Sequence, residues 1–423
     1  MNSDVEIERP AEPVASGPTI LLIATTPWIS STRLAKSLRL CGFVVEAVCH
    51  VAHPLRLLDR PIQTHRLGWI LEERSIRLAV AKSKPSLIVP CDDAAVAILH
   101  RLHRAAGDRE FSALIEASLG NPANFAAAGN RSELIALAHS MGLRAPLSQP
   151  VGGLDNLMRL AKSHAFPCVL KRDHTWAGFG VKIVERAQDI RAAWSWIAGP
   201  FSLLRSGISG LRHKRPRAFV DFCKDRSAAI ELQEYIPGRP ANRAVVCRDG
   251  RVLAGISVEA LQTSYPNGPA SVVRVVDNPE MTATVEALVG RLGLSGFCGF
   301  DFIMAETGRA YLLELNPRAT PVCHLAVSDA TDLPAALYRA VTGKEPAALA
   351  PPVPGEIVAL FPNELERDPS SAMLLEAYHD APWDEPRLLE KAGLRGSVCG
   401  PRRNENHRPS DTAKDSRNFL GPV

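Results

Sequence analysis

The apolar positions of the chain fall into short runs typical of strands and longer periodic runs typical of helices. One apolar run spans residues 19–25 and a second spans residues 43–48. Between them Leu34 and Leu38 have helical spacing, and Gly42 follows, which can take the left-handed conformation that ends helices. Strand, helix and strand at this spacing predict a βαβ unit with parallel strands.

The same pattern continues to about residue 125, and we predict an N-terminal α/β domain over residues 18–125. A helical segment over 70–81 leads to an apolar strand over 86–89, which ends in Asp92 and Asp93. Ligands bind at the carboxyl ends of parallel strands, so both acids are candidates to contact a substrate amine. They are equally suited to cap the helix that follows.

Residues 296–318 hold a second pattern, which predicts a β-hairpin. Two runs of aromatic and aliphatic residues flank Thr307 and Gly308, which suit a two-residue loop. In that register Asp301 lies opposite Glu314. The other face is predicted to be core and carries Phe300, Phe302, Met304, Tyr311, Leu313 and Leu315.

Two facing carboxylates repel each other unless a cation lies between them. Asn316 lies two residues beyond Glu314 and so points to the same face as the acids. An oxygen-only set of Asp301, Glu314 and Asn316 suits a hard cation, Mg²⁺ or Mn²⁺. Arg318 follows Pro317, which stops the strand, and its fork suits a carboxylate or phosphate. The alternative is a solvated hairpin face with Arg318 as the surface partner of the acids.

The segments Gly-Phe-Asp301-Phe-Ile and Leu-Leu-Glu314-Leu-Asn-Pro-Arg318 resemble the metal-binding strand pair of the ATP-grasp superfamily of carboxylate ligases. The resemblance covers residues 126–345. It implies an ATP-grasp domain of two subdomains, preceded by the parallel-sheet α/β domain that commonly precedes it. The expected fold class is therefore α/β in the first part of the chain and α+β in the rest.

Lys171 ends an apolar strand and is followed by a loop that contains Gly178 and Gly180. Glycines allow backbone amides to close over phosphate oxygens, and the lysine adds a positive charge. This spacing resembles the phosphate-covering loop of ATP-grasp proteins, although a plain hairpin with a long loop would also fit. Asn130 predicts a helix cap. The resemblance implies that Arg131, at the start of that helix, reaches the phosphates; otherwise Arg131 faces solvent.

The apolar strand over 230–236 breaks at Pro237-Gly238 and resembles the family's nucleotide hinge. Many members carry a ribose-binding glutamate where this chain has Pro240, and Asn242 is the candidate substitute. The adenine contacts implied by the resemblance are Gln233, Glu234, Tyr235 and Ile236.

The resemblance implies an ADP-forming ligase that uses ATP and Mg²⁺. A substrate carboxylate would attack the γ-phosphate of ATP to give an acyl phosphate, and an amine would then attack the acyl carbon. Arg318 is the expected catalytic residue, because it would stabilise the oxyanion of that step. A thiol acceptor, ATP-dependent carboxylation through carboxyphosphate, and an ATP-binding regulator or scaffold without ligation are the alternatives.

The composition agrees with a soluble enzyme of small molecules. The 423 residues carry a net charge of +4, too small to indicate a nucleic-acid partner. The nine cysteines are scattered, which favours a reducing, cytoplasmic location. No apolar run reaches membrane-spanning length, and neither a P-loop nor a dinucleotide fingerprint occurs. The expected partners are small carboxylates and amines, with no membrane, and a homodimer is left open.

The remaining segments carry no chemistry that the sequence reveals. Residues 1–17 and 396–423 are predicted to be a disordered leader and tail. A basic segment over 205–217 is expected to be a solvated loop, or else an insertion that guides acidic ligands to the site. Residues 346–395 form a C-terminal extension that begins with a Pro/Ala linker and contains a candidate last strand over 356–361.

Overall fold

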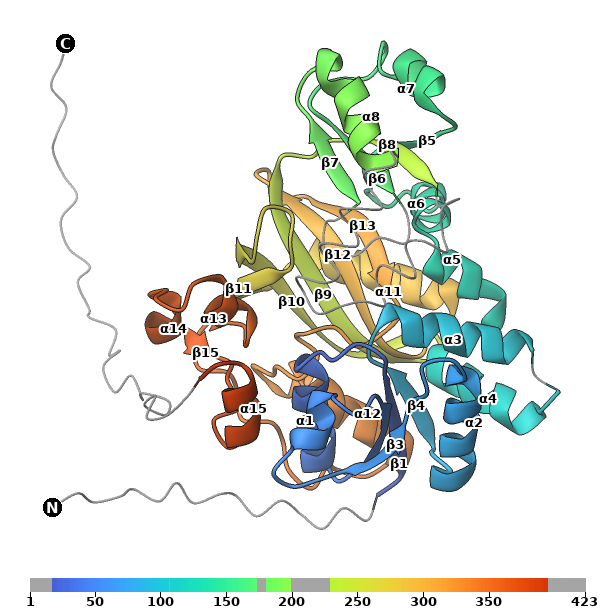
Figure 1. The fold of residues 1–423 in the computed structure, drawn as a ribbon, viewed down its shortest axis with the longest axis vertical. Helices are drawn as coiled ribbons and strands as arrows, with labels where there is room; N and C mark the ends of the chain where they lie inside the picture. Colours follow the sequence, from blue (N-terminus) through green and yellow to red (C-terminus); the bar gives the residue numbers. More distant parts are fainter. Residues whose placement is uncertain (1–16, 106, 173–179, 199–228, 395–423) are drawn as a thin grey trace, which may run out of the picture.

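The computed structural model describes residues 17–105, 107–172, 180–198 and 229–394. Three sheets follow one another along the chain in these residues (Figure 1): a four-stranded parallel sheet, a four-stranded antiparallel sheet and a seven-stranded sheet. The predicted fold class, α/β followed by α+β, is confirmed. The predicted leader and tail lie outside the described residues, apart from Gly17, and so does the basic segment over 205–217.

The N-terminal unit is a parallel sheet with strand order β3-β2-β1-β4 and helices packed on it. Its strands are β1 Thr19–Ala24, β2 Val44–Cys49, β3 Gln63–Arg66 and β4 Leu87–Pro90. Its helices are α1 Ser30–Cys41, η1 Pro54–Leu57, α2 Glu72–Ser83, α3 Asp93–Arg104 and α4 Arg109–Leu119. From β1 the chain adds β2 and β3 on one side and then crosses to add β4 on the other side. The space between the ends of β1 and β4 is therefore a topological switch point.

Three short helices lead from the N-terminal unit to the small antiparallel sheet. They are η2 Pro122–Asn124, α5 Phe125–Gly129 and α6 Arg131–Ser140. The small sheet has the order β5-β8-β6-β7, with β5 Ser148–Val151, β6 Cys168–Arg172, β7 Val181–Val184 and β8 Ile230–Glu234. Its apolar face packs against α7 Leu154–Leu160 and α8 Ile190–Ala198, which η3 Ala187–Asp189 precedes.

The large sheet has the order β13-β12-β9-β10-β11-β14-β15. Its strands are β9 Gly238–Arg248, β10 Arg251–Thr263, β11 Ala270–Val276, β12 Gly296–Ala305, β13 Ala310–Asn316, β14 Ile357–Ala359 and β15 Tyr378–His379. Its helices are α11 Pro279–Leu292, η4 Asp329–Thr331, α12 Leu333–Thr342, α13 Asn363–Arg367, α14 Met373–Glu376 and α15 Pro386–Lys391. The candidate strand over 356–361 is present as β14, which pairs with β11, but it is not the last strand, because β15 follows and pairs with it.

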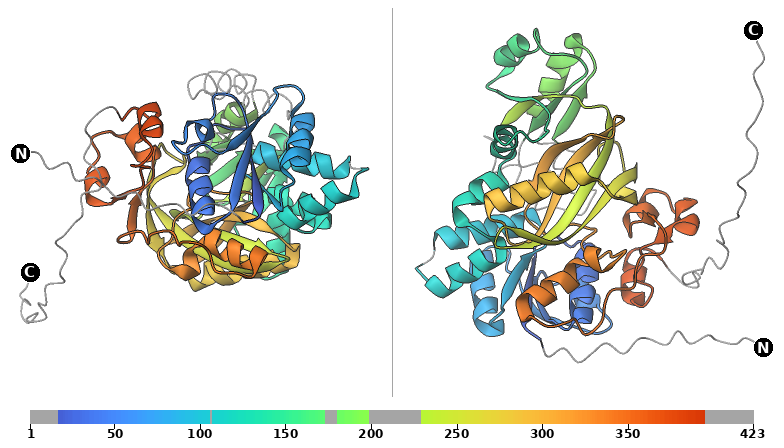
Figure 2. Two further views of the ribbon diagram at one scale, coloured as in Figure 1. Left: turned by 90° about the horizontal axis from the view of Figure 1, so that it is seen from below. Right: turned by 180° about the vertical axis from the view of Figure 1, so that it is seen from behind.

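The two faces of the large sheet bury different partners. Val245 and Phe300 lie in the core beneath α11, which crosses the back of the sheet (Figure 2). Ala244 and Val246, on the opposite face, share a core with residues of β1, β2 and α1 in the N-terminal unit. Because side chains alternate along a strand, Asn242 on β9 points to the same side as Ala244, toward the N-terminal unit.

Helix and turn signals were the most reliable part of the sequence reading. Gly42 closes α1 with a φ of 109°, and Asp249-Gly250 form the predicted turn between β9 and β10, with φ of 50° and 77°. Asn130 caps α6 by accepting a hydrogen bond from the backbone of Glu133. The prediction missed β3, because its residues (Gln-Thr-His-Arg) form a polar edge strand without an apolar pattern.

Candidate active site

The hairpin of β12 and β13 sets two carboxylates opposite each other. Asp301 pairs with Glu314 in the register that the sequence predicted. The route to that register differs, because the loop has three residues: the backbone N–H of Ala305 donates to the carbonyl of Arg309 at 2.9 Å. Gly308 occupies this loop with a φ of 78°, which glycine adopts more readily than other residues.

A β-bulge offsets the longer loop. Phe302 pairs with Leu312 and the next pair is Asp301 with Glu314, so Leu313 has no partner in the ladder. The predicted core face is therefore wrong on β13, where Leu312 is buried and Leu313 is only half-buried. Tyr311 is also half-buried and outside that core, whereas Phe300, Phe302 and Leu315 are buried as predicted and Met304 packs against them.

Amide and guanidinium groups surround the two acids. Asp301 accepts hydrogen bonds from Asn242 Nδ2 at 2.7 Å and from Asn316 Nδ2 at 2.9 Å. Glu314 Oε2 accepts from Arg131 Nη2 at 2.7 Å. Asn242, predicted as a ribose contact, is thus placed beside the acid pair. Its Oδ1 is buried and has no hydrogen-bond partner among the described residues.

The two acids have opposite pKa shifts. Burial and the nearby charge of Glu314 raise the pKa of Asp301 to about 7. Burial acts in the same direction on Glu314, but the charges of Arg131 and Lys171 outweigh it and hold the pKa of Glu314 below its ordinary value. A facing pair of this kind, with one acid poised near neutrality, is typical of functional sites rather than of solvated surfaces.

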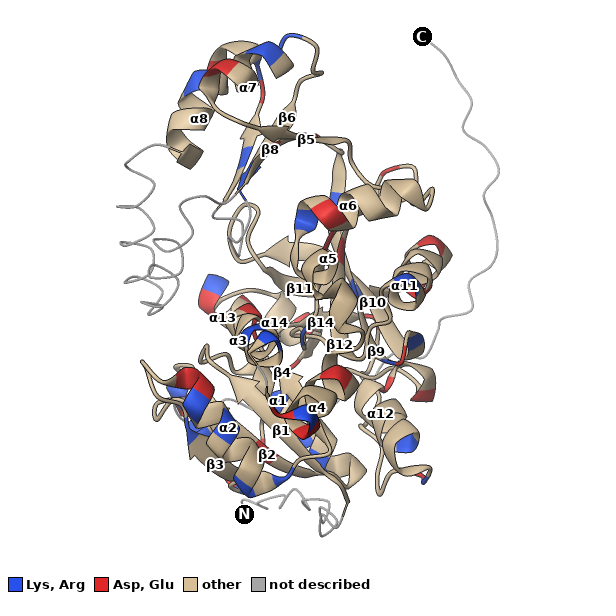
Figure 3. Ribbon diagram, turned by 90° about the vertical axis from the view of Figure 1, so that its right-hand side faces the viewer, with Lys and Arg blue, Asp and Glu red and all other residues tan. Residues whose placement is uncertain are grey.

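Lys171 and Arg131 bring positive charge to the acids from the small sheet and from α6. Lys171 lies on β6 and is 8% exposed, and Arg131 is the first residue of α6. Basic and acidic segments lie at one end of α6 in Figure 3. Burial and the neighbouring charge of Arg131 lower the pKa of Lys171 to about 8, against the opposing effect of Glu314, Glu231 and Asp301.

Glu231 is a charged residue of this cluster that the sequence reading missed. It lies on β8 opposite Lys171, is 3% exposed, and accepts hydrogen bonds from the hydroxyls of Ser132 and Ser148. The signal was present in the sequence as the alternation of Glu231 and Gln233 around Leu232, which gives β8 one polar and one apolar face.

The predicted hinge residues lie at the end of β8 and in the connection to β9. Gln233 is 1% exposed, and its Nε2 has no hydrogen-bond partner among the described residues. Glu234 accepts from the backbone N–H of Leu147 at 3.1 Å and lies at the strand end, before Tyr235 and Ile236.

Of the two predicted loop glycines, Gly178 lies outside the described residues. Gly180 is described, and its carbonyl accepts from the backbone N–H of Arg172 at 2.9 Å, which joins the end of the loop to β6. The two predicted strands on either side of the loop are present as β6 and β7, and they pair antiparallel, with Lys171 opposite Val181.

Arg318 leaves the end of β13 and reaches the N-terminal unit. Its Nε and Nη2 donate to the two carboxylate oxygens of Asp93 at 2.6 and 3.1 Å, and Nη2 also donates to Asn316 Oδ1 at 3.0 Å. The ring of Trp28 lies 5.3 Å from the guanidinium carbon. Burial opposes the charge of Arg318, but Asp93 outweighs it and raises the pKa. No sequence pattern indicated Trp28.

Asp92, the other acid at the end of β4, has a structural role. Its carboxylate caps α3 by accepting from the backbone of Ala95, and it also accepts from the hydroxyl and backbone of Thr25 and the backbone of Thr26. The capping interpretation is thus right for Asp92. Asp93 is the acid whose carboxylate is available to another part of the molecule.

The donor set next to Asp301 fits a hard divalent cation. Asp301, Glu314 and the amides of Asn316 and Asn242 offer only oxygen ligands, and the orphaned Asn242 Oδ1 is a buried acceptor beside Asp301. In the described part of the chain, no group of three or more His, Cys, Asp or Glu residues is arranged to hold a metal. A softer metal site built from histidine and cysteine is therefore not seen there.

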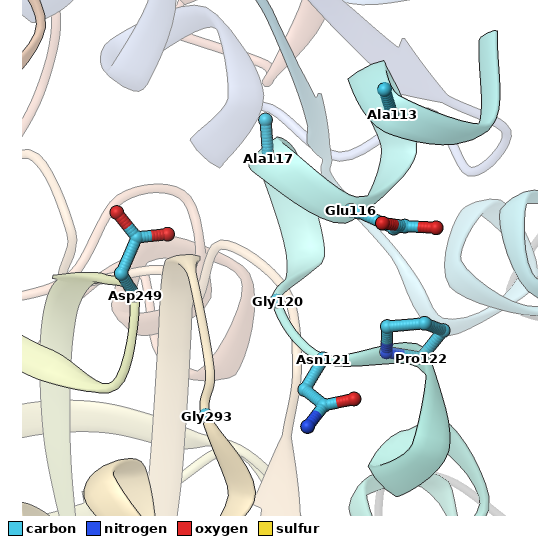
Figure 4. A pocket seen from close by; sticks show the side chains of 8 residues that line it. All are labelled: Ala113, Glu116, Ala117, Gly120, Asn121, Pro122, Asp249 and Gly293. Atoms are coloured by element: carbon cyan, nitrogen blue, oxygen red, sulfur yellow. The ribbon is translucent and has the colours of Figure 1, made fainter. Parts of the chain in front are cut away.

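A separate cavity of about 560 Å³ lies between α4, the β9–β10 turn and the end of α11 (Figure 4). Its two acids already have partners: Glu116 accepts from His103 at 2.7 Å, and Asp249 lies 3.6 Å from Arg248. None of the residues that line this cavity is Asp301, Glu314, Lys171, Arg131 or Arg318.

No helix among the described residues is long and apolar enough to cross a membrane.

Comparison with known proteins identifies the fold. The family model described as "ATP-grasp domain" matches residues 204–322, and the chain therefore contains an ATP-grasp domain. No curated protein sequence matches the chain. The match includes Asp301, Glu314, Asn316 and Arg318 and the hinge residues, whereas Arg131 and Lys171 precede it.

Solved structures share the architecture at low sequence identity. The biotin carboxylase domain of Hydrogenobacter thermophilus 2-oxoglutarate carboxylase, solved with MgADP and bicarbonate, aligns with a TM-score of 0.54 and 15% identity over 78% of this chain and 71% of that one. Carboxyaminoimidazole ribonucleotide synthase from Aspergillus clavatus, complexed with ATP, aligns with a TM-score of 0.52 and 14% identity over 81% and 79%. An L-amino acid ligase from Bacillus licheniformis aligns at 0.53 and 13% over 77% and 75%.

Proposed function

We propose that the protein is an ADP-forming ligase that activates a small carboxylate with ATP and transfers the acyl group to an amine. The observation that carries this proposal is the facing pair of Asp301 and Glu314, with Lys171 and Arg131 on one side and Arg318 on the other. Three cations gathered around a partly buried acid pair suit a substrate that brings several negative charges together with a divalent cation, such as the phosphates of ATP.

Each part of the cluster has a distinct role in this proposal. Lys171 and Arg131 bind phosphate oxygens, and the carboxylates of Asp301 and Glu314 with Asn316 hold Mg²⁺. When bound there, Mg²⁺ supplies neutralisation of the charge that develops on the phosphates. The hinge residues Gln233 to Ile236 contact adenine, and the orphaned Nε2 of Gln233 supports a polar ligand at this position.

The chemistry proceeds in two steps that conserve charge and atoms. A carboxylate oxygen of the substrate attacks the γ-phosphorus of ATP, the bond from that phosphorus to the β–γ bridging oxygen breaks, and ADP leaves. The amine then attacks the acyl carbon of the acyl phosphate, loses a proton, and inorganic phosphate leaves. Arg318, near the acids and with most of its surface buried, stabilises the carboxylate before the first step and the oxyanion in the second.

ATP-dependent carboxylation is the second candidate. It is supported by the fold shared with a biotin carboxylase domain solved with bicarbonate and with carboxyaminoimidazole ribonucleotide synthase. In that reaction bicarbonate takes the place of the carboxylate and carboxyphosphate that of the acyl phosphate. The L-amino acid ligase has a similar TM-score, so likeness of fold does not separate the two reactions.

The test is a screen for ADP and phosphate release from ATP and Mg²⁺ in the presence of small carboxylates, amines and bicarbonate. Release that needs both a carboxylate and an amine supports the ligase. Release that needs bicarbonate supports the carboxylase. Nucleotide binding without release in any mixture, bicarbonate included, would count against both enzymes and favour an ATP-binding regulator or scaffold.

A further inference from the structure

The ion pair between Arg318 and Asp93 joins two parts of the molecule that are far apart in sequence. Arg318 follows β13 of the large sheet, and Asp93 is the first residue of α3 in the N-terminal unit. Trp28, which stacks near the guanidinium, comes from the loop between β1 and α1. The three side chains therefore meet at the switch point between the ends of β1 and β4, where parallel sheets bind ligands.

The backbone fixes the positions from which this pair is made. The N–H of Ala319, next to Arg318, donates to the carbonyl of Pro90 at the end of β4, at 3.1 Å. Asp92 anchors the start of α3 to Thr25 and Thr26 at the end of β1. Asp93 and Arg318 thus face each other across a boundary that these hydrogen bonds hold on both sides.

The two charges of the pair have unequal access to water. The side chain of Arg318 is 12% exposed and that of Asp93 is 55% exposed. The Nη2 of Arg318 that donates to Asp93 also donates to Asn316, which itself donates to Asp301. A group bound by Arg318 would therefore lie next to the acid pair, and a group bound by Asp93 would lie on the open side.

The charge arrangement selects among ligands that could open this pair. A simple amine would displace Arg318 from Asp93 and leave a largely buried guanidinium without its direct carboxylate partner, which is costly. A simple carboxylate would satisfy Arg318 but place two negative charges side by side. A zwitterion gives both residues a new partner, because its carboxylate replaces Asp93 on Arg318 and its ammonium replaces Arg318 on Asp93.

We propose that the substrate whose carboxylate is activated is an α-amino acid, held with its carboxylate on Arg318 and its ammonium on Asp93. This inference rests on the proposed ligase function and narrows its carboxylate to one chemical class. The substrate carboxylate would take the place of Asp93 on the guanidinium fork, beside the ring of Trp28. Asp93 is then a specificity residue supplied by the N-terminal unit.

Binding without turnover tests this directly. The full-length protein is saturated with ADP and Mg²⁺ and titrated with glycine, acetate and methylammonium, which have similar sizes and differ in charge. Calorimetry gives the affinities, and tryptophan fluorescence reports on Arg318 through Trp28. Loss of the fluorescence change in Trp28→Phe assigns the signal to this position. Glu73→Gln is the matched control, because Glu73 pairs with Arg101 on the surface, with 44% and 47% exposed side chains.

We expect glycine to bind at least about tenfold more tightly than acetate or methylammonium, a difference of roughly 1.4 kcal/mol. Asp93→Asn should weaken glycine about tenfold and leave acetate bound no more weakly than in the wild type, since a competing carboxylate is gone. Asp93→Glu should keep the preference for glycine, and Glu73→Gln should leave every affinity unchanged.

Equal affinities for glycine and acetate in the wild type, or an unchanged preference in Asp93→Asn, would overturn the inference, as would the absence of any Trp28 signal. The outcome of this binding test can be distinguished from the outcome of the screen for ADP release. A glycine preference without ADP release in any mixture contradicts the ligase alone. ADP release with plain carboxylates, and no preference for glycine, contradicts the amino-acid substrate alone.

Discussion

Glu314 is the residue whose charge the proposed metal site needs most. It stays ionised because Arg131 and Lys171 outweigh the effect of its burial on the pKa. Glu314→Gln keeps the shape and an acceptor for Arg131 but removes the negative charge. We expect it to abolish the Mg²⁺-dependent part of ADP binding and all ADP release, with at least a tenfold loss of metal affinity. Calorimetric titrations of ADP with Mg²⁺ and with a chelator measure this loss, and unchanged Mg²⁺ dependence would remove the metal assignment.

Lys171 is expected to contribute to ATP binding only while it is protonated. Burial and Arg131 lower its pKa to about 8, so nucleotide affinity should fall as the pH rises from about 7 to about 9. Lys171→Ala should weaken ATP binding about tenfold or more and remove this pH dependence. Lys182→Ala is the control, because exposed Lys182 lies on neighbouring β7 against the ring of Trp196. Calorimetry at several pH values measures the ATP affinities. Equal affinities for Lys171→Ala and the wild type would contradict the role of Lys171 in phosphate binding.

The β12–β13 hairpin reaches its register because a three-residue loop and a β-bulge compensate each other. The sequence predicted the pairing of Asp301 with Glu314 from the strand runs and the Thr-Gly turn. It did not reveal that the loop takes a third residue, or that Leu313 leaves the ladder to offset it. The extra residue falls on β13, the edge strand of the sheet, where bulges are common, whereas β12 pairs with β9 without a shift.

Gly308 carries the conformational demand of that loop. Its φ is 78°, and a Cβ built there would meet nothing within 4 Å, so only backbone strain opposes a side chain. Gly308→Ala should therefore lower the free energy of unfolding by about 1 kcal/mol. Gly152→Ala, at a glycine with equally open space and no positive φ, should be neutral or slightly stabilising. Urea unfolding followed by circular dichroism compares them, and equal effects at the two sites would refute the explanation.

The contacts that the sequence could not reveal are those between elements. Asp301, Glu314, Asn316 and Arg318 lie within one hairpin, so local spacing was enough to group them. Glu231 joins Lys171 by pairing of β8 with β6, and Trp28 and Asp93 join Arg318 by docking of the N-terminal unit on the large sheet. Such neighbours follow from topology, for which a single sequence carries no periodic signal.

At the scale of the whole molecule, the predicted C-terminal extension ties the N-terminal unit to the segment after Arg318. Asp380 is 2% exposed and bonds both Arg33 of α1, at 2.5 Å, and His324, at 2.9 Å. Nearby, Lys36 of the same helix pairs with Glu385 at 2.8 Å and with Asp384. The side chains of Asp380, His324 and Arg33 are 2%, 6% and 13% exposed, whereas Asp384 in the second cluster is 59% exposed. Asp380 should therefore contribute far more to stability than Asp384.

The buried Asp380 should make the free energy of unfolding depend on pH. Burial opposes ionisation of Asp380, but the charges of Arg33 and His324 outweigh it and hold its pKa below the ordinary value. A carboxyl with a lowered folded-state pKa contributes stability above its unfolded-state pKa and loses it as the pH falls through the folded-state value. The contribution should thus be complete at pH 7 and decline below about pH 4.

Asp380→Asn removes this contribution at neutral pH, and we expect it to destabilise the protein by roughly 3 kcal/mol because it leaves Arg33 buried without a counter-charge. The difference from the wild type should narrow as the pH falls below about 4, where the wild-type carboxyl also becomes neutral. Asp384→Asn is the matched control: its side chain is 59% exposed on the same segment, and its effect should be small at every pH. Thermal unfolding of the wild type and the two variants between neutral and acidic pH measures how far each variant differs from the wild type in stability. If the stability difference between Asp380→Asn and the wild type were the same at every pH, the cluster would hold these parts together by shape rather than by charge.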